Sequence, residues 1–344
     1  GGLTWAEVTF PPALELYAEN PSSPTAPSAT GTNAVAIGDS AVASNSNSLS
    51  IGGFSDATGS SSMAVGRLAQ ATGYSSNAFG LQANASGSYA TALGRGSGAA
   101  SISAGSGSTS IGGSYASGTD SLAAAIGTSS ASYGATGANS VAMGYQAKAS
   151  GNKSLALGYK PIASGNGAKA FGGFGLGVGT TASAEGSTAI GDGASSTVSY
   201  KTAITTRPFA ALGDAQAGIF VMKAATTDAT ATALTSDSNS AGSGNQVVAA
   251  SDTCITFHGT VVAMQNGAQA HAGWEIKGML VNDGGTTTLA LGNVSDMAAT
   301  NASSWAVALS ADNTNNALKI QVTGEASHNI RWVANVQTSE VTYA

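Results

Sequence analysis

A hydrophobic residue followed directly by glycine recurs at a fixed spacing through the first half of the chain. Successive pairs are 14 residues apart from Ile37 to Leu93, and again from Met143 to Phe171. The residues before each glycine alternate in type, as in Ala34-Val35-Ala36-Ile37, and this period of two predicts a strand of about four residues. A short period kept over many copies predicts the stacked coils of a solenoid.

Each period has room for two short strands and two turns. The glycine after the hydrophobe supplies either a positive φ or space for a neighbouring backbone at the corner. A second short segment, such as Ala69-Gln70-Ala71, ends at Gly or Asn and predicts the second turn. The predicted structural repeat glycines are Gly38, Gly52, Gly66, Gly80, Gly94, Gly112, Gly127, Gly144, Gly158, Gly172 and Gly191.

Both faces of these strands carry small or apolar side chains, so both faces need cover. Ala and Ser fit a thin roll interior, whereas the larger hydrophobes need a partner surface, which a closed cyclic homotrimer supplies most simply. A flexible Gly/Ser/Ala linker is the alternative, but a linker has no reason to keep register. The residues predicted for the trimer interface or roll core are Ile37, Ile51, Val65, Phe79, Leu93, Met143, Leu157 and Phe171.

Several repeat units resemble a known family. The stretches "NAVAIGDSAVAS", "NSVAMGYQAKASG" and "KSLALGYKPIASG" resemble the head repeats of YadA-like trimeric autotransporter adhesins. The resemblance implies a left-handed parallel β-roll that assembles as a trimer. Similar repeats also occur in bacteriophage tail fibres, so the resemblance speaks for architecture more than for a particular ligand.

From about residue 196 glycine becomes less frequent and longer alternating strands appear, with no helical pattern between them. Trp274, Ile276 and Leu280 share one strand face, for example, while Glu275 and Lys277 share the other. Such strands predict an antiparallel β-sandwich or jelly roll. The words "WEIKGMLVNDGG" and "ALKIQVTGEASHNIRWVANVQTSEV" resemble a C-terminal module of tailed-phage structural proteins. Because the last strands lack the character of a membrane anchor, this half favours a phage fibre over an autotransporter.

The chain is therefore predicted to be all-β, with three segments. Residues 1–32 form an N-terminal attachment or cap segment followed by a Pro-rich linker, 33–195 the β-roll stem, and 196–344 the C-terminal sandwich. The apolar residues of 1–20 suit docking to another protein, and they equally suit capping of the first coil, whose edge would otherwise be unpaired.

Composition narrows the partners. Only 9% of residues are charged and 47 are Gly, which is typical of a fibrous β-protein. The net charge of −6 argues against binding to a phosphate backbone, so we expect no nucleic-acid partner. No apolar run reaches the length of a membrane span, so we expect no membrane insertion.

Candidate chemistry is sparse, and we expect no catalytic residue, cofactor or metal. The three histidines lack metal-ligand spacing, and His258 is predicted to be a surface residue. Cys254 is predicted to pack as a small apolar side chain. A glycan-cleaving tailspike would need two carboxylates across a groove, and the roll carries few acids.

Two groups of aromatic residues could in principle contact sugars. Trp274, Trp305 and Trp332 each lie in an alternating strand, which favours core packing over sugar stacking. Tyrosines near the repeat corners are better candidates for exposed contact, although they could equally shield coil edges. These are Tyr89, Tyr115, Tyr145 and Tyr159.

Together these features predict a non-enzymatic phage virion fibre, a tail fibre or similar appendage, located on the virion outside the cell. Its stiff trimeric arm would present host-receptor-binding surfaces in three copies, so that weak contacts to a receptor such as a glycan add by avidity. The N-terminal segment or the C-terminal domain would contact other virion proteins. The alternatives are a bacterial surface trimeric adhesin passenger and a tailspike glycan depolymerase.

Overall fold

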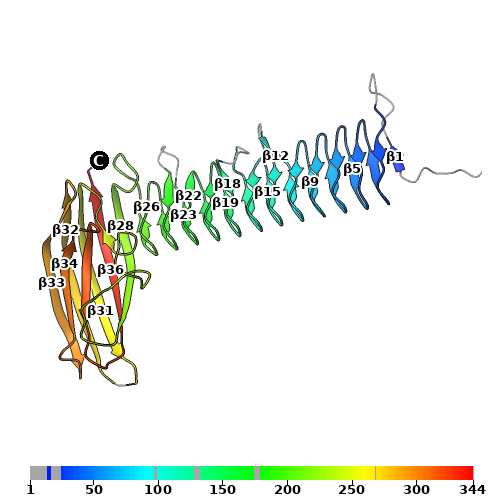
Figure 1. Ribbon diagram of the computed structural model, residues 1–344. Helices are drawn as coiled ribbons and strands as arrows, with labels where there is room; N and C mark the ends of the chain where they lie inside the picture. Colours follow the sequence, from blue (N-terminus) through cyan, green and yellow to red (C-terminus); the bar gives the residue numbers. More distant parts are fainter. Residues whose placement is uncertain are drawn as a thin grey trace, which may run out of the picture. The chain divides into compact units, whose positions relative to one another are not determined.

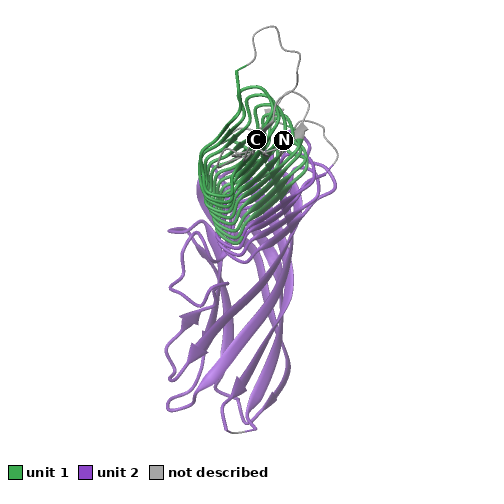
Figure 2. Cartoon of the chain, turned by 90° about the vertical axis from the view of Figure 1, so that its right-hand side faces the viewer, with its two compact units in different colours: residues 1–153 green, residues 154–344 purple. Residues whose placement is uncertain are grey.

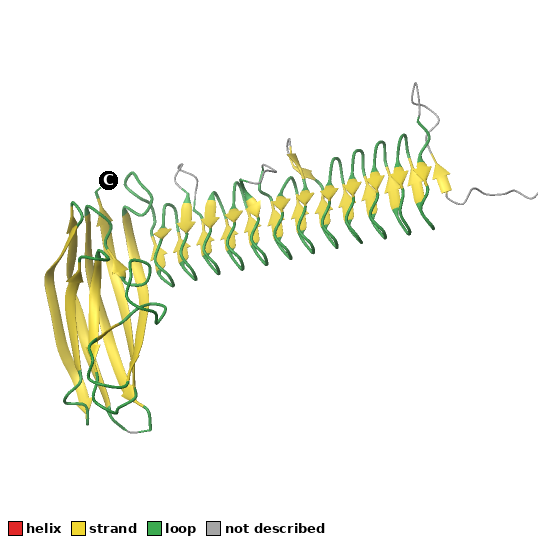
Figure 3. Cartoon of the chain, viewed as in Figure 1, coloured by secondary structure: helices red, strands yellow, loops and turns green. Residues whose placement is uncertain are grey.

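The computed structural model describes residues 14–16, 25–96, 99–127, 132–173, 179–267 and 269–343, and these contain strands and turns but no helix (Figure 3). The chain divides into two compact units, residues 1–153 and 154–344 (Figure 2).

The first unit is a stack of coils with two parallel sheets on opposite sides of a thin interior (Figure 1). The first sheet holds β3 (Val35–Ile37), β5 (Leu49–Ile51), β7 (Met63–Val65), β9 (Asn77–Phe79), β11 (Thr91–Leu93), β15 (Thr109–Ile111), β17 (Leu122–Ala124) and β19 (Val141–Met143). The second sheet holds β2 (Ser28–Ala29), β4 (Val42–Ala43), β6 (Asp56–Ala57), β8 (Gln70–Ala71), β10 (Asn84–Ala85), β14 (Ile102–Ser103), β16 (Tyr115–Ala116), β18 (Gly134–Ala135) and β20 (Lys148–Ala149).

The strands stack in register, because each coil repeats the one before it. Ala36 pairs with Ser50, and Ser50 pairs with Ala64. A tight turn closes each corner, as when the Ala41 N–H donates to the Gly38 carbonyl at 3.2 Å. Ser40 in that turn has a φ of 54°, a left-handed conformation that recurs at the corners of later coils.

The coils begin earlier than the sequence indicated. Ser28 pairs with Val42, so part of the segment expected as a Pro-rich linker already belongs to the second sheet. No hydrophobe-glycine pair precedes it, and so the repeat signal starts later than the stack does. The backbone of β1 (Leu14–Leu16) pairs parallel with β3, the position of a capping strand. The rest of residues 1–24 lies outside the described residues.

The longest irregular step between repeat glycines in this unit is absorbed by an excursion from the stack. After Gly94 the chain forms β12 (Arg95–Gly96) and β13 (Ala99–Ala100), which pair antiparallel with each other, before β14 rejoins the second sheet. The extra residues thus leave the coil without widening it.

The second unit begins with coils of the same kind. Its parallel strands are β21 (Leu155–Leu157), β23 (Lys169–Phe171), β25 (Thr188–Ile190) and β27 (Thr202–Ile204) on one side, and β22 (Pro161–Ala163), β24 (Thr180–Ala182) and β26 (Ser195–Ser196) on the other. Coil structure therefore continues past Ser195, the predicted end of the roll.

Strand β27 then pairs antiparallel with the first strand of a five-stranded antiparallel sheet, which we call the long sheet. Its order is β28 (Ala215–Thr226), β36 (Ile330–Thr342), β31 (Thr253–Gln265), β32 (His271–Asp283) and β33 (Thr286–Thr300). A short sheet has β35 (Ala317–Thr323) paired with β34 (Ala306–Asp312), β29 (Thr232–Ala233) and β30 (Val247–Val248).

One hydrophobic core joins the inward residues of the long and short sheets. Phe220, Ile276 and Ile320 are among its buried members. The Trp332 ring lies 5.5 Å from the Trp274 ring and 5.7 Å from the Trp305 ring, between centroids. All three tryptophans are at most 5% exposed, which confirms their predicted core role.

Candidate functional site

The interior of the coils is filled by small side chains. The middle residue of each first-sheet strand in the first unit is a fully buried Ala or Ser, such as Ala36, Ser50 and Ala64. Several of the serine hydroxyls are satisfied locally: the Ser50 Oγ lies 2.7 Å from the Ser55 Oγ, and the Ser62 Oγ donates to the Gly59 carbonyl at 2.6 Å. The two sheets are too close for larger side chains, so larger side chains must point outward.

The outward side of the first sheet forms an apolar face. In the first unit its members are Val35, Ile37, Leu49, Ile51, Met63, Val65, Phe79, Leu93, Ile111, Leu122, Val141 and Met143, interrupted by Asn77, Thr91 and Thr109. In the second unit the corresponding face carries Leu155, Leu157, Phe171, Ile190 and Ile204, interrupted by Lys169, Thr188 and Thr202. Neighbouring coils cover these side chains only in part, and Met143 remains 42% exposed.

These positions correct part of the sequence interpretation. All eight hydrophobes predicted for the trimer interface or roll core lie on the apolar face, and none lies in the roll interior. The reason is size, because the inward middle position of each first-sheet strand holds only Ala or Ser. The eight are Ile37, Ile51, Val65, Phe79, Leu93, Met143, Leu157 and Phe171.

The outward side of the second sheet differs in chemistry and forms a polar face in the first unit. It presents Ser28, Asp56, Gln70, Asn84 and Lys148, together with Val42, Ile102 and Tyr115. Asn84 Nδ2 donates to Gln70 Oε1 at 3.2 Å, so neighbouring coils also share a side-chain ladder. Burial raises the pKa of the Asp56 carboxyl, because desolvation disfavours its charged form.

The predicted repeat glycines directly follow the first-sheet strands, except for Gly127. After β17 the corner position is taken by Ala125, with a φ of 55°, and Gly127 comes two residues later. All of the repeat glycines except Gly172 have a positive φ, from 65° at Gly112 to 133° at Gly66. A Cβ added at Gly52 would lie 2.7 Å from the carbonyl carbon and oxygen of Gly66 in the next coil. Gly94 and Gly112 have open space instead, since they flank the coil interrupted by the β12–β13 excursion.

A second column of glycines follows the second-sheet strands, and the sequence indicated these only as turns. A Cβ on Gly59, Gly73 or Gly87 would overlap the carbonyl oxygen of the residue stacked on it in the next coil. Their φ angles are not positive, so the requirement is close approach alone. Asn45 and Ala184 replace glycine at equivalent stacked positions. The column is therefore not a strict glycine repeat, and it is harder to recognise in the sequence.

The corner tyrosines are distributed over different surfaces. Tyr89 is 61% exposed, and its ring meets the Tyr74 ring edge to face with centroids 5.4 Å apart. Tyr145 is 45% exposed, whereas Tyr115 points out from the polar face. The Lys160 Nζ lies 5.2 Å from the centre of the Tyr159 ring.

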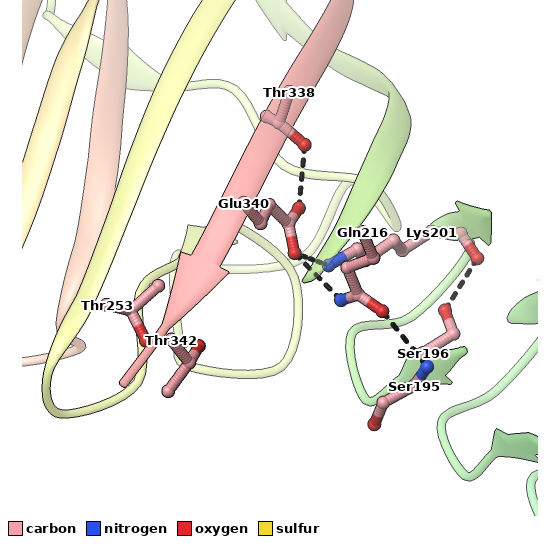
Figure 4. A network of polar contacts seen from close by, with 8 residues as sticks. All are labelled: Ser195, Ser196, Lys201, Gln216, Thr253, Thr338, Glu340 and Thr342. Atoms are coloured by element: carbon pink, nitrogen blue, oxygen red, sulfur yellow. Dashed lines mark hydrogen bonds and ion pairs between the residues drawn. The ribbon is translucent and has the colours of Figure 1, made fainter. Parts of the chain in front are cut away.

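A buried polar network ties the last coils to the long sheet within the second unit (Figure 4). The Lys201 Nζ donates to the Glu340 Oε2 at 2.6 Å, with both side chains at most 6% exposed. Gln216 donates to the same oxygen at 2.8 Å, and its own Oε1 accepts the Ser195 N–H at 3.0 Å. Thr338 donates to the other Glu340 oxygen at 2.6 Å. The charge on Glu340 is thus compensated by three donors, which a buried carboxylate needs.

The remaining candidate groups lie apart. His258 has a 63% exposed side chain and lies 3.1 Å from Glu275, which confirms it as a surface residue. Cys254 is a free cysteine that lies partly exposed on the outward side of β31, rather than packed in the core as expected. Among the described residues, no group of His, Cys, Asp and Glu is arranged to hold a metal ion, and no helix could span a membrane.

Comparison with known proteins identifies the repeats. Residues 29–55, 57–76, 71–97, 135–160 and 173–194 match the family model of the YadA head domain repeat. The comparison with curated proteins finds no match.

Among solved structures, one similar chain is the tailspike protein gp49 from Acinetobacter baumannii bacteriophage Fri1, a capsular polysaccharide depolymerase. The identity is 8% and the TM-score 0.26, over 94% of this chain and 50% of that one. This chain thus spans half the length of that tailspike, and so distant a likeness carries no argument.

The parallel coils, the stacked corner glycines and the family match agree on one conclusion: the repeat region is a YadA-like β-roll.

Proposed function

We propose that this chain is a structural and adhesive fibre protein of a bacteriophage virion, a tail fibre or similar appendage, that acts as a homotrimer without catalysis. The observation that carries the proposal is the difference between the two outer faces of the roll. The first sheet presents an apolar face and the second a polar one, although the interior between them is already full.

The apolar face has the chemistry of a subunit interface. Monomeric proteins seldom expose a contiguous apolar strip that repeats with every coil. Complete burial of a Val, Leu or Ile side chain contributes about 1.5–3 kcal/mol, and the side chains of this face are at most 42% exposed, so covering the remainder contributes roughly 0.5–1 kcal/mol at each position. Summed over the coils of one chain, this is on the order of 10 kcal/mol, comparable with the roughly 4–15 kcal/mol of freedom lost on association. Three copies that turn their apolar faces to a common axis would cover all of them.

The same arrangement leaves the polar face and the corner tyrosines outward, in three copies. A receptor on the host surface, such as a glycan, would then be bound by repeated weak contacts that add through avidity. The N-terminal segment or the C-terminal domain would contact other virion proteins. The resemblance of the C-terminal half to modules of tailed-phage structural proteins supports the virion setting. We propose that the C-terminal half forms a β-sandwich that acts as the tip of the fibre or as a docking unit.

A second candidate is a bacterial surface adhesin passenger, favoured by the match to the YadA head repeat. Both candidates predict an extracellular fibre, and they differ in the particle that carries it. Gold-labelled antibodies to the chain should decorate purified virions under the first proposal and the cell envelope under the second.

Light scattering of the purified full chain tests the assembly. We expect a trimer for the parent, and monomers when Ile51→Lys and Val65→Lys are combined, because both charges would enter the subunit interface. The matched control combines Gln70→Lys and Asn84→Lys on the polar face and should remain trimeric. A monomeric parent would reject the proposal. Release of reducing sugar ends from host polysaccharide would reject the non-catalytic part alone.

A further inference from the structure

The loop between β27 and β28 presents an exposed aromatic side chain on a fixed backbone. Phe209 is 82% exposed. The Asp214 carboxylate accepts the backbone N–H groups of Phe209 at 2.8 Å and of Ala210 and Ala211 at 2.7 Å each. Gly213 also donates to the Gly193 carbonyl at 2.8 Å, which anchors the loop to the last coils. Phe209 is therefore held out from the molecule by a loop that would lose little freedom on binding.

The outward side of the long sheet has a hollow of about 480 Å³ close to the start of this sheet. We call it the junction hollow, because it lies where β27, β28, β36 and β31 adjoin. Small side chains leave the space, notably Ala217 and Ser339, while Ile204 and Ile219 supply apolar walls. Phe209 does not line it, so the aromatic side chain and the hollow do not meet within one chain.

The junction hollow is continuous with the apolar face of the second unit. Ile204, the last outward hydrophobe of the coils, pairs with Ala217, and Thr202 pairs with Ile219. One sheet surface thus runs from the coils onto the long sheet. A neighbouring copy packed on the apolar face, as in the proposed trimer, would necessarily lie at the edge of the junction hollow.

From these observations we propose that Phe209 of one copy inserts into the junction hollow of the next copy, a contact repeated around the trimer. A projection and a complementary hollow at different places on one chain make a heterologous contact, and cyclic symmetry closes such contacts into a ring. The inference rests on the proposed trimer and adds to it a lock between subunits at the junction of coils and long sheet.

Stability of the assembly tests the contact. Phe209→Ala should speed subunit exchange between differently labelled trimers by about 30-fold per contact, the size of an aromatic hot spot. Ala217→Phe, which fills the hollow from its own chain, should speed subunit exchange to a similar extent. The double variant should exchange no faster than either single variant, because all three variants remove the same contact. Tyr89→Ala removes a similarly exposed ring from the roll and should leave exchange unchanged. Fully additive single effects would overturn the proposal.

Proximity gives an independent test through the native thiol. Cys254 lies on the same outward side of β31 as Thr256, which lines the hollow. In a Phe209→Cys variant, a short bis-maleimide should therefore link neighbouring chains into covalent trimers on a denaturing gel, and Cys254→Ser should abolish the links. A trimer by light scattering that yields no linked chains would overturn this inference alone, whereas a monomer would overturn the proposed assembly as well.

Discussion

Two adjacent glycines at one corner of the roll should respond to alanine in opposite ways. Gly52 has a φ of 128°, a region that only glycine occupies easily, and an added Cβ would lie 2.7 Å from the backbone of Gly66. Gly53 does not have a positive φ, and its Cβ would meet nothing closer than the Asp39 carbonyl at 3.9 Å.

The magnitude for Gly52→Ala follows from two terms. The backbone conformation costs a non-glycine residue about 1–3 kcal/mol. The clash pushes the next coil away and weakens the bond from the Gly66 N–H to the Ile51 carbonyl, now 2.8 Å, which contributes roughly 1 kcal/mol. Gly53→Ala should instead stabilise by about 0.4–1 kcal/mol, because it restricts the unfolded chain. The two variants should therefore differ by roughly 3 kcal/mol.

Native-state hydrogen exchange is the appropriate assay, since each coil of a solenoid contacts only its neighbours and opens locally. Protection of the Gly66 amide should fall sharply in Gly52→Ala and remain or rise in Gly53→Ala. Protection that agrees between the two variants to within about 0.5 kcal/mol would refute the steric account of the corner.

Three further predictions concern charged groups. Lys201→Met should destabilise the second unit by about 3–5 kcal/mol in chemical denaturation, because Glu340 stays buried and loses its cation, and adding Glu340→Gln should recover most of that loss. Asp56→Asn should stabilise the first unit at neutral pH by less than about 1 kcal/mol. The variant removes a charge whose Oδ1 atom is buried without a hydrogen-bond partner among the described residues. The gain is small because solvent screens the rest of the carboxylate. Burial by itself would raise the pKa of Asp214, but the N–H donors of Ala211, Ala210 and Phe209 lower it below the ordinary 3.8. The contribution of Asp214 to the stability of the fold should therefore be complete above pH 3.8 and be lost as the pH falls further. An NMR titration of the carboxyl measures this pKa.

The signs of these effects provide the checks. A raised Asp56 pKa means that the gain from Asp56→Asn must shrink as the pH falls toward 3.8, because the carboxyl takes up its proton in the folded state before it does so in the unfolded state. A gain that stayed constant with pH would contradict the desolvation argument. For Lys201, a double variant as unstable as Lys201→Met alone would show that packing, and not the unpaired charge, sets the cost.

The repeat could be predicted from sequence because its signal is both local and periodic. The pair Ile51-Gly52 marks a strand and its corner, and the alternation in Leu49-Ser50-Ile51 already indicates which residue is small enough for the interior. The outward place of the larger hydrophobes then follows from the width of the coil. The start of the stack was predicted too late, since Ser28-Ala29 pairs as a strand without the hydrophobe-glycine mark.

Other features have no local signal in the sequence. Lys201 and Glu340 are separated by 139 positions, and their buried pair depends on how β27 meets the long sheet. The exposure of Phe209 depends on Asp214 taking up three backbone donors, which a loop sequence does not show. These are consequences of tertiary packing, whereas the corners of the roll follow from the repeat alone.

The in-register stacking also bears on how such a protein can change over generations. Asp56-Ala57 pairs with Gln70-Ala71 one coil later, so excision of residues 57–70 would join Asp56 to Ala71 and restore a strand of the same pattern. Recombination between such similar repeats would shorten or lengthen the stack by whole coils and leave both ends unaltered. The number of coils can therefore change without any change in the segments at the two ends, so the length of the stack can evolve independently of them.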